Sequence, residues 1–200
     1  MKTTPRFPSD LNAESVATII AQFPANDATS ANQLFDALLA EGNDALVDLC
    51  GELVPQGGGD DNAARYALTG LARYVSRPDA DSGRDIVEEA LLEALENANN
   101  VEVQAFLLRQ LQQCGGNETV SEIGVLLLDD TTASYAILTL DAIGTHKARK
   151  VLTKALKKTT GKTQLQILSV LANNGSNHNA ARTAESRLEG ADANECVHLL

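Results

Sequence analysis

One apolar pattern recurs three times in the second half of the chain. It is FLLRQLQQCG at residues 106–115, AILTLDAIG at 136–144 and ILSVLANNG at 167–175. The aligned positions hold leucine at 111, 140 and 171, and glycine at 115, 144 and 175. A helical apolar pattern that returns every 29 to 31 residues indicates tandem helical units. The glycine after each stretch predicts a helix end, because glycine readily takes the left-handed conformation found there.

Each unit is predicted to contain a second helix after the glycine. In the fourth unit this helix carries the apolar residues Ala148, Val151, Leu152, Ala155 and Leu156. The turn between the two helices is short, which makes them antiparallel. We therefore expect an all-α fold, an α-solenoid of stacked helix pairs that spans the chain as one domain.

Five helix pairs, a preceding helix and a partial sixth pair are expected along the chain. The predicted pairs cover residues 31–55, 62–98, 100–129, 130–160 and 162–190. A helix at 9–23, with Leu11, Val16, Ile19 and Ile20 on one side, is predicted to cap the first pair. The partial sixth pair, 192–200, stops in mid-pattern on two leucines. We therefore expect this chain to be a piece of a longer protein.

The composition agrees with an all-helical soluble chain. Aromatic residues make up 4% and Trp is absent, which argues against sandwiches and barrels. Apolar residues make up 44%, too many for a disordered chain. No apolar run approaches the ~18 residues of a membrane span, so none is expected. The N-terminus MKTTPRFPSD lacks the apolar core of a signal peptide. Two interpretations remain: a cytosolic protein, or an exported protein whose signal peptide is replaced by a starting Met.

Antiparallel helix pairs of about thirty residues in tandem resemble HEAT repeats in their short bacterial form. This resemblance implies a right-handed α-α superhelix of the HEAT/ARM type. Four stretches, QFPA at 22–25, LVP at 53–55, ARYAL at 64–68 and FLLRQLQ at 106–112, extend the resemblance. They are similar to the N-terminal part of exported bacterial proteins that carry a 3-keto-disaccharide hydrolase-type domain. The resemblance implies an exported or periplasmic location and a fused domain after Leu200.

The sequence offers no catalytic or metal-binding constellation. His146 and His178 follow repeat glycines and are expected to be exposed turn residues, and His198 lies near the chain end. The cysteines lie in apolar helical patterns without the spacing of zinc ligands, which predicts buried thiols. They are Cys50, Cys114 and Cys196.

Two short motifs resemble ligand loops only in part. GKT at 161–163 lacks the earlier glycine and the strand of a phosphate-binding loop, which predicts an interhelical turn. DADSG at 79–83 lacks the Gly and Glu of a calcium loop, which predicts an exposed insertion in which Asp81 or Ser82 caps the next helix. We therefore expect no cofactor and no enzymatic activity in this chain.

Charge is distributed unevenly along the chain. The formal net charge is −11, from 16 Lys+Arg and 27 Asp+Glu. Residues 1–100 carry 6 basic and 17 acidic residues, whereas residues 101–200 carry 10 of each. Stripes on the second helices of the pairs indicate an acidic binding surface, followed by a basic one in the fourth unit. The predicted binding residues are Asp44, Asp48, Glu52, Glu89 and Glu93, and Lys147, Lys150, Lys154, Lys157 and Lys158. The alternative is that both stripes are solvated outer faces.

Three classes of function remain. The first is a non-catalytic protein-interaction or scaffolding module that binds a protein partner or a fused downstream domain. The second is a nucleic-acid-binding protein, which the single basic unit and the missing Trp disfavour, so no nucleic acid is expected as partner. The third is a HEAT-like lyase, for which the polar and aromatic side chains at residues 65–77 form the one dense cluster. Ordinary interhelical packing also accounts for that cluster.

Overall fold

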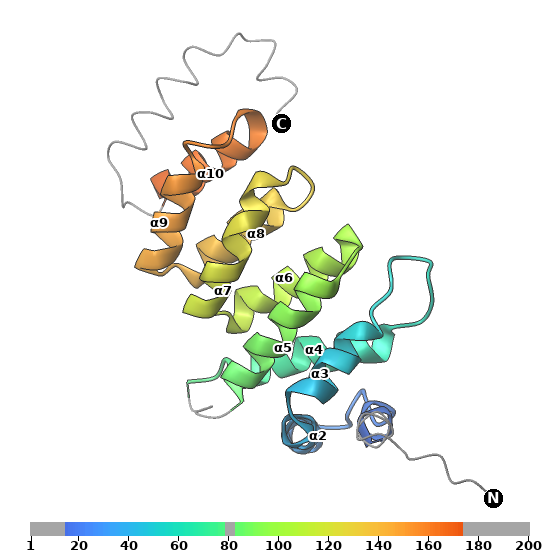
Figure 1. Ribbon diagram of the computed structural model, residues 1–200. Coiled ribbons are helices and arrows are strands. Elements are labelled where there is room, and N and C mark those ends of the chain that lie inside the picture. The colour runs from blue at the N-terminus through green and yellow to red at the C-terminus, as the bar shows by residue number, and fades with distance from the viewer. Residues whose placement is uncertain (1–14, 79–82, 174–200) are drawn as a thin grey trace, which may run out of the picture. The chain divides into compact units, whose positions relative to one another are not determined.

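A computed structural model describes residues 15–78 and 83–173, and every regular element in these ranges is a helix (Figure 1). The predicted all-α class is therefore confirmed. In chain order the elements are α2 (Ala28–Glu41), α3 (Asn43–Gly51), α4 (Asn62–Val75), α5 (Arg84–Asn97), α6 (Val101–Cys114), α7 (Asn117–Ile123), the 3-10 helix η1 (Gly124–Leu128), α8 (Ala133–Ile143), α9 (His146–Ala155) and α10 (Gly161–Asn173). In the described part of the chain, no helix is both long and apolar enough to span a bilayer.

The chain forms two compact units, residues 1–116 and 117–200. In the first unit α3 packs against α5, and α6 packs against both α4 and α5. In the second unit α8 contacts η1, α9 and α10. The right-handed superhelix over the whole chain stays a prediction.

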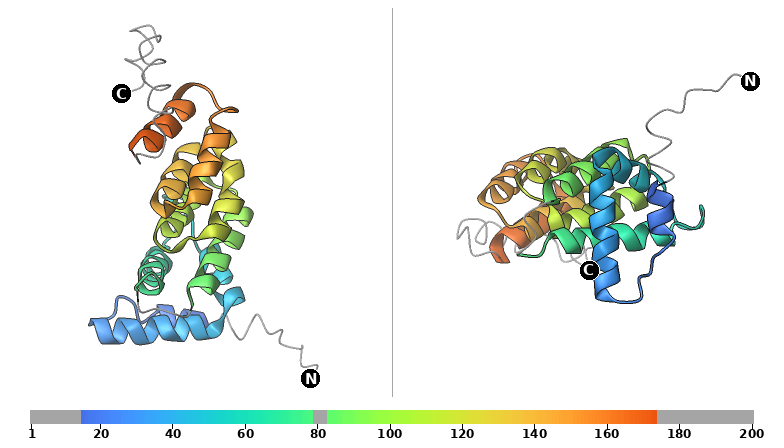
Figure 2. Two further views of the ribbon diagram at one scale, coloured as in Figure 1. Left: turned by 90° about the vertical axis from the view of Figure 1, so that its left-hand side faces the viewer. Right: turned by 90° about the horizontal axis from the view of Figure 1, so that it is seen from below.

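The predicted helix at 9–23 lies partly in the described residues. Residues 15–20 are helical, and Val16, Ile19 and Ile20 are buried, as the apolar pattern predicts. Figure 2 shows this segment beside α2, where Ser15 Oγ donates a 2.8 Å hydrogen bond to Glu41 Oε1. Leu11 lies outside the described residues, as do the partial sixth pair and the end of the fifth.

The leucines that define the repeat are core residues. Leu111, Leu140 and Leu171 are at most 2% exposed, on α6, α8 and α10. Full burial of a leucine side chain stabilises a fold by about 1.5–3 kcal/mol. The recurring pattern therefore marks the buried face of three helices.

The two described repeat glycines end their helices in different ways. Gly144 takes the predicted left-handed conformation, with φ 63°, and its N–H donates to Leu140 O. Gly115 has φ −64° and ψ 148°, so the left-handed prediction is wrong there. The guanidinium of Arg84 donates to the carbonyl oxygens of Cys114 (2.7 Å) and Gly115 (3.0 Å). These two bonds satisfy carbonyls at the end of α6 that have no partner within the helix.

The second helix of the third pair is also irregular. The apolar pattern predicts one continuous helix, but α7 changes into the 3-10 helix η1 at Gly124. A Cβ added at Gly124 would lie 3.2 Å from Val151 Cγ1, so the glycine allows α9 to approach closely. Val120, Ile123 and Leu127 stay buried across the change.

Candidate functional site

Five exposed carboxylates lie on two neighbouring helices of the first unit. Asp44 and Asp48 are one turn apart on α3, Glu52 caps the C-terminal end of that helix, and Glu89 and Glu93 are one turn apart on α5. We call these five residues the acidic face. Helix α3 packs against α5, so the predicted acidic residues of the first two pairs come from adjacent helices.

A side-chain hydrogen bond joins the two helices at the acidic face. Asn43 Nδ2 donates to Glu93 Oε2 over 3.2 Å, from the first residue of α3 to the last third of α5. None of the five carboxylates forms an ion pair with a described residue. The charge of the acidic face is therefore left for solvent ions or a binding partner to balance.

Arg65 in the first unit is engaged in structural contacts. Arg65 forms an ion pair with Asp61 (2.8 Å), donates to Val54 O and lies over the Phe106 ring at 4.7 Å. The hydrogen bond that Arg65 Nε donates to Asp61 Oδ2 holds the pKa of Asp61 below its usual range. Arg65 therefore connects the turn before α4 to α6 and does not neutralise the acidic face.

The remaining polar and aromatic residues of the 65–77 cluster do not converge on one site. Tyr74 donates a short hydrogen bond to Asp36, and the Arg77 guanidinium lies 3.9 Å from the centre of the Tyr74 ring. Tyr66 is 51% exposed and lines a separate small cavity of about 350 Å³ with Phe23. These residues therefore serve separate contacts and separate surfaces.

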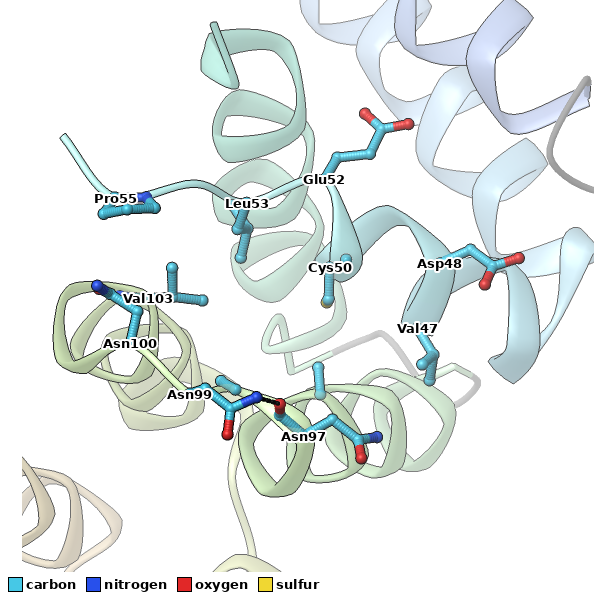
Figure 3. A pocket seen from close by; sticks show the side chains of 13 residues that line it. Val47, Asp48, Cys50, Glu52, Leu53, Pro55, Asn97, Asn99, Asn100 and Val103 are labelled. Carbon is cyan, nitrogen blue, oxygen red and sulfur yellow. Dashed lines mark hydrogen bonds between the residues drawn. The ribbon is translucent and has the colours of Figure 1, made fainter. Parts of the chain in front are cut away.

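A larger cavity of about 720 Å³ opens beside the acidic face, and no sequence pattern predicts it (Figure 3). We call it the α3–α5–α6 pocket, because the C-terminal ends of α3 and α5 and the N-terminal end of α6 form its walls. Its lining residues are Val47, Asp48, Cys50, Gly51, Glu52, Leu53, Pro55, Ala94, Asn97, Ala98, Asn99, Asn100 and Val103. Two members of the acidic face, Asp48 and Glu52, thus belong to the pocket as well.

The pocket has an apolar interior and a polar rim. Leu53, Val103 and Cys50 are less than 9% exposed, and Figure 3 shows their side chains between the α3 and α6 walls. Asp48 and Glu52 lie on the α3 side of the pocket, and Figure 3 shows their carboxylates turned outward from Cys50 and Leu53, at the outer rim. No lysine or arginine lines this cavity. The shape and charge suit an apolar group that carries a positive charge at its margin.

The basic residues predicted in the fourth unit lie on and just after α9. Lys150 and Lys154 are exposed on the helix, whereas Lys157 and Lys158 follow its end, so the basic stripe extends beyond the helix that should carry it. These four lysines form no hydrogen bond or ion pair with the described residues. Lys147 differs, because its Nζ donates to Asn117 O (2.9 Å) and Ser121 Oγ (2.5 Å) and ties α9 to α7.

Of the histidines and cysteines singled out in the sequence, His146, Cys50 and Cys114 lie in the described residues. His146 is exposed at the start of α9, whereas His178 and His198 lie outside the described residues, as does Cys196. Cys50 and Cys114 are buried free thiols, and burial raises the pKa of each to about 12. The described ranges hold no group of three His, Cys, Asp or Glu side chains that could bind a metal ion.

The GKT motif at 161–163 lies in a different element from the predicted one, and the DADSG motif at 79–83 is described only at its last residue. Gly161, Lys162 and Thr163 form the first turn of α10, so the predicted interhelical turn is wrong for these residues. The insertion at 79–82 lies outside the described residues. Gly83, with φ 94°, occupies the N-cap position of α5.

Comparison of the chain with protein-family models, curated proteins and solved structures finds no match.

Proposed function

We propose that this chain is a non-catalytic protein-interaction module of the HEAT-like α-solenoid type, which binds the basic surface of a partner through its acidic face. The observation that carries the proposal is the set of five exposed carboxylates on the packed helices α3 and α5, none of which forms an ion pair with a described residue. A partner with complementary charge is attracted from a distance and oriented as it approaches. The partner is a separate protein or a domain fused to this chain.

The arrangement of these carboxylates also supports a binding role. Asp44 and Asp48, Asp48 and Glu52, and Glu89 and Glu93 are like-charge pairs one helical turn apart. Such pairs repel each other and lower helix stability. A basic partner would relieve that repulsion on binding, whereas a purely solvated face gains nothing from this spacing.

The proposal is tested on the full chain with an array of extended ten-residue peptides that contain two to four Lys or Arg residues. One variant combines Asp44→Asn, Glu89→Gln and Glu93→Gln, which leaves Asp48 and Glu52 in place. Because exposed ion pairs are individually weak, we expect the three changes together to lower binding about tenfold. Binding should also fall as salt is added.

A matched control changes the same amount of charge in the second unit. It combines Glu118→Gln, Glu122→Gln and Asp130→Asn, all at exposed positions. We expect this control to bind like the unmodified chain. Equal losses in both variants would mean that bulk charge, and not the acidic face, attracts the peptides, and this result would overturn the proposal.

Nucleic acid is the second candidate partner, because four exposed lysines around the end of α9 lack counter-ions among the described residues. A single short basic stretch supplies few phosphate contacts, so binding would be weak and very sensitive to salt. A gel shift with single- and double-stranded DNA at low salt tests this candidate. We expect no shift, and a shift lost on changing Lys150 and Lys154 to Glu would favour nucleic acid.

A further inference from the structure

The α3–α5–α6 pocket is an open surface cavity large enough to admit a small ligand. Its volume of about 720 Å³ lies within the ~300–1,000 Å³ range of small-ligand pockets. Three separate segments of the chain form it, 47–55, 94–100 and Val103. A single amino-acid side chain would leave most of this space empty, so the volume suits several residues of an extended peptide.

The electrostatics of the pocket favour a positive charge at its α3 edge. Asp48 and Glu52 are exposed there, and helices α3 and α5 both end at the pocket wall. The C-terminal end of a helix carries a partial negative charge, because its last carbonyl groups lack helical partners. Two carboxylates and two helix C-terminal ends thus all contribute negative electrostatic potential at the pocket.

The N-terminal end of α6 does little to offset this potential. Asn100 Oδ1 accepts hydrogen bonds from the N–H groups of Glu102 (2.8 Å) and Val103 (3.3 Å), so donors that would attract an anion are occupied. Glu102 adds a further carboxylate in the first turn of α6, and its Oε2 accepts a hydrogen bond from Gln56 N–H (2.8 Å). An anionic ligand therefore finds few free donors at this wall.

We propose that the α3–α5–α6 pocket binds a short extended segment of a partner protein, in which an aliphatic side chain enters the cavity and an adjacent Lys or Arg pairs with Asp48 and Glu52. Leu53, Val103 and Cys50 supply the apolar contact. The carboxylates at the rim supply selectivity for a basic neighbour. This inference rests on the proposed function, since it assigns the partner's recognition motif to one part of the same surface.

Three tetrapeptide probes separate the apolar and charged contributions. They are acetyl-Ala-Leu-Arg-Ala-amide, the same peptide with Ala in place of Leu, and the same peptide with citrulline, a neutral analogue of Arg, in place of Arg. Each is titrated into the isotope-labelled full chain, and amide chemical shifts are followed by NMR. We expect the first probe to shift amides of residues 47–55 and 94–103, about tenfold weaker binding without Leu and about fivefold weaker binding with citrulline.

Position 51 allows the pocket to be obstructed without disturbing the core. A Cβ added to Gly51 has no atom within 4 Å, and Gly51 lines the pocket at the end of α3. Gly51→Phe adds a bulky side chain at the wall of the cavity and is expected to obstruct peptide entry and greatly weaken the shifts, whereas Gly51→Ala, which keeps the cavity open, should retain them. Both variants leave the charge unchanged.

A second pair of variants tests whether the carboxylates at the pocket rim contribute to binding of the Arg probe. Asp48→Asn with Glu52→Gln should weaken binding of the Arg probe about fivefold and leave the citrulline probe unaffected. The control, Asp44→Asn with Glu96→Gln, removes two exposed carboxylates of α3 and α5 that do not line the pocket, and should bind normally.

The outcomes separate this inference from the function proposed above. Absent or dispersed shifts with the Arg probe, or equal binding of the citrulline probe, would overturn the pocket assignment. The array variant at Asp44, Glu89 and Glu93 lies outside the pocket and still reports on the acidic face. The converse result is that the Arg probe shifts only amides at the pocket while the triple variant binds the peptide array like the unmodified chain. That result would support the pocket assignment and overturn the proposal that the acidic face binds a partner.

Discussion

At Gly70, helix propensity and tertiary packing predict opposite effects of a Gly70→Ala substitution on the free energy of unfolding. It lies inside α4 and faces the Phe35 ring of α2; an added Cβ would overlap Phe35 Cζ and lie 2.9 Å from Cε1. The ring has little freedom to move away. It is 7% exposed and lies between Phe23 and Tyr74, with centroid distances of 5.4 and 5.3 Å.

The expected effect of Gly70→Ala follows from two opposing contributions. Replacing glycine by alanine inside a helix favours folding by about 0.8–1 kcal/mol. Forcing an extra methyl into a filled site costs about 1–3 kcal/mol. Because the overlap with Phe35 is severe, we expect the second contribution to win and the free energy of unfolding to fall by about 1–2 kcal/mol.

Gly51→Ala is the matched control for this change. Gly51 ends α3, and its added Cβ meets no atom within 4 Å, so only the helix propensity acts. We expect a gain of about 0.5 kcal/mol. The urea midpoints of both variants and of the unmodified chain are measured by circular dichroism at 222 nm.

A double-mutant cycle identifies the steric partner. In a Phe35→Leu background the obstructing ring is absent, so Gly70→Ala should become neutral or stabilising, with a coupling energy of about 1–3 kcal/mol. A Gly70→Ala variant as stable as Gly51→Ala would refute the reasoning, and so would a destabilisation that is unchanged in the Phe35→Leu background.

Two further predictions concern ionisable groups. Asp61→Asn should lower the free energy of unfolding at pH 7, because it removes the carboxylate that pairs with Arg65 and whose pKa is lowered. The stabilisation from this carboxylate is complete above the ordinary carboxyl pKa. It is lost as the pH falls through the lowered pKa of the folded state. Urea midpoints of the two proteins should therefore converge below pH ~4, and a constant gap down to pH ~2 would contradict this. Cys50 and Cys114, with pKa values near 12, should resist a thiol reagent at pH 8 in a Cys196→Ser variant and react on unfolding; rapid labelling of the native protein would show that they are accessible.

The helices could be predicted from the sequence because their signals are local. Apolar spacing identified the buried faces that hold Leu111, Leu140 and Leu171, and glycine at 144 marked a helix end. The end at Gly115 was assigned the wrong geometry, because its carbonyls are capped by Arg84, 31 residues earlier in the chain. No local pattern contains that information.

The candidate site, too, was predictable from the sequence only where its signals are local. The charged residues of the acidic face and their helical spacing were evident in the sequence, and the close packing of α3 on α5 makes them neighbours. Nothing in the spacing of Lys147 distinguished it from Lys150, yet contacts with α7 hold its ammonium group. The α3–α5–α6 pocket was missed, because its walls come from segments about 50 residues apart.

By itself the sequence determined where most of the helices lie, which helix faces are apolar and where charge accumulates, since each depends on neighbours within one or two turns. Only the tertiary structure decided which charges remain unpaired, whether a glycine has room for a side chain, and where a cavity remains. Gly51 and Gly70 both lie in helices, but one faces open space and the other an aromatic ring. That difference arises from contacts between distant segments, which short-range periodicity does not encode.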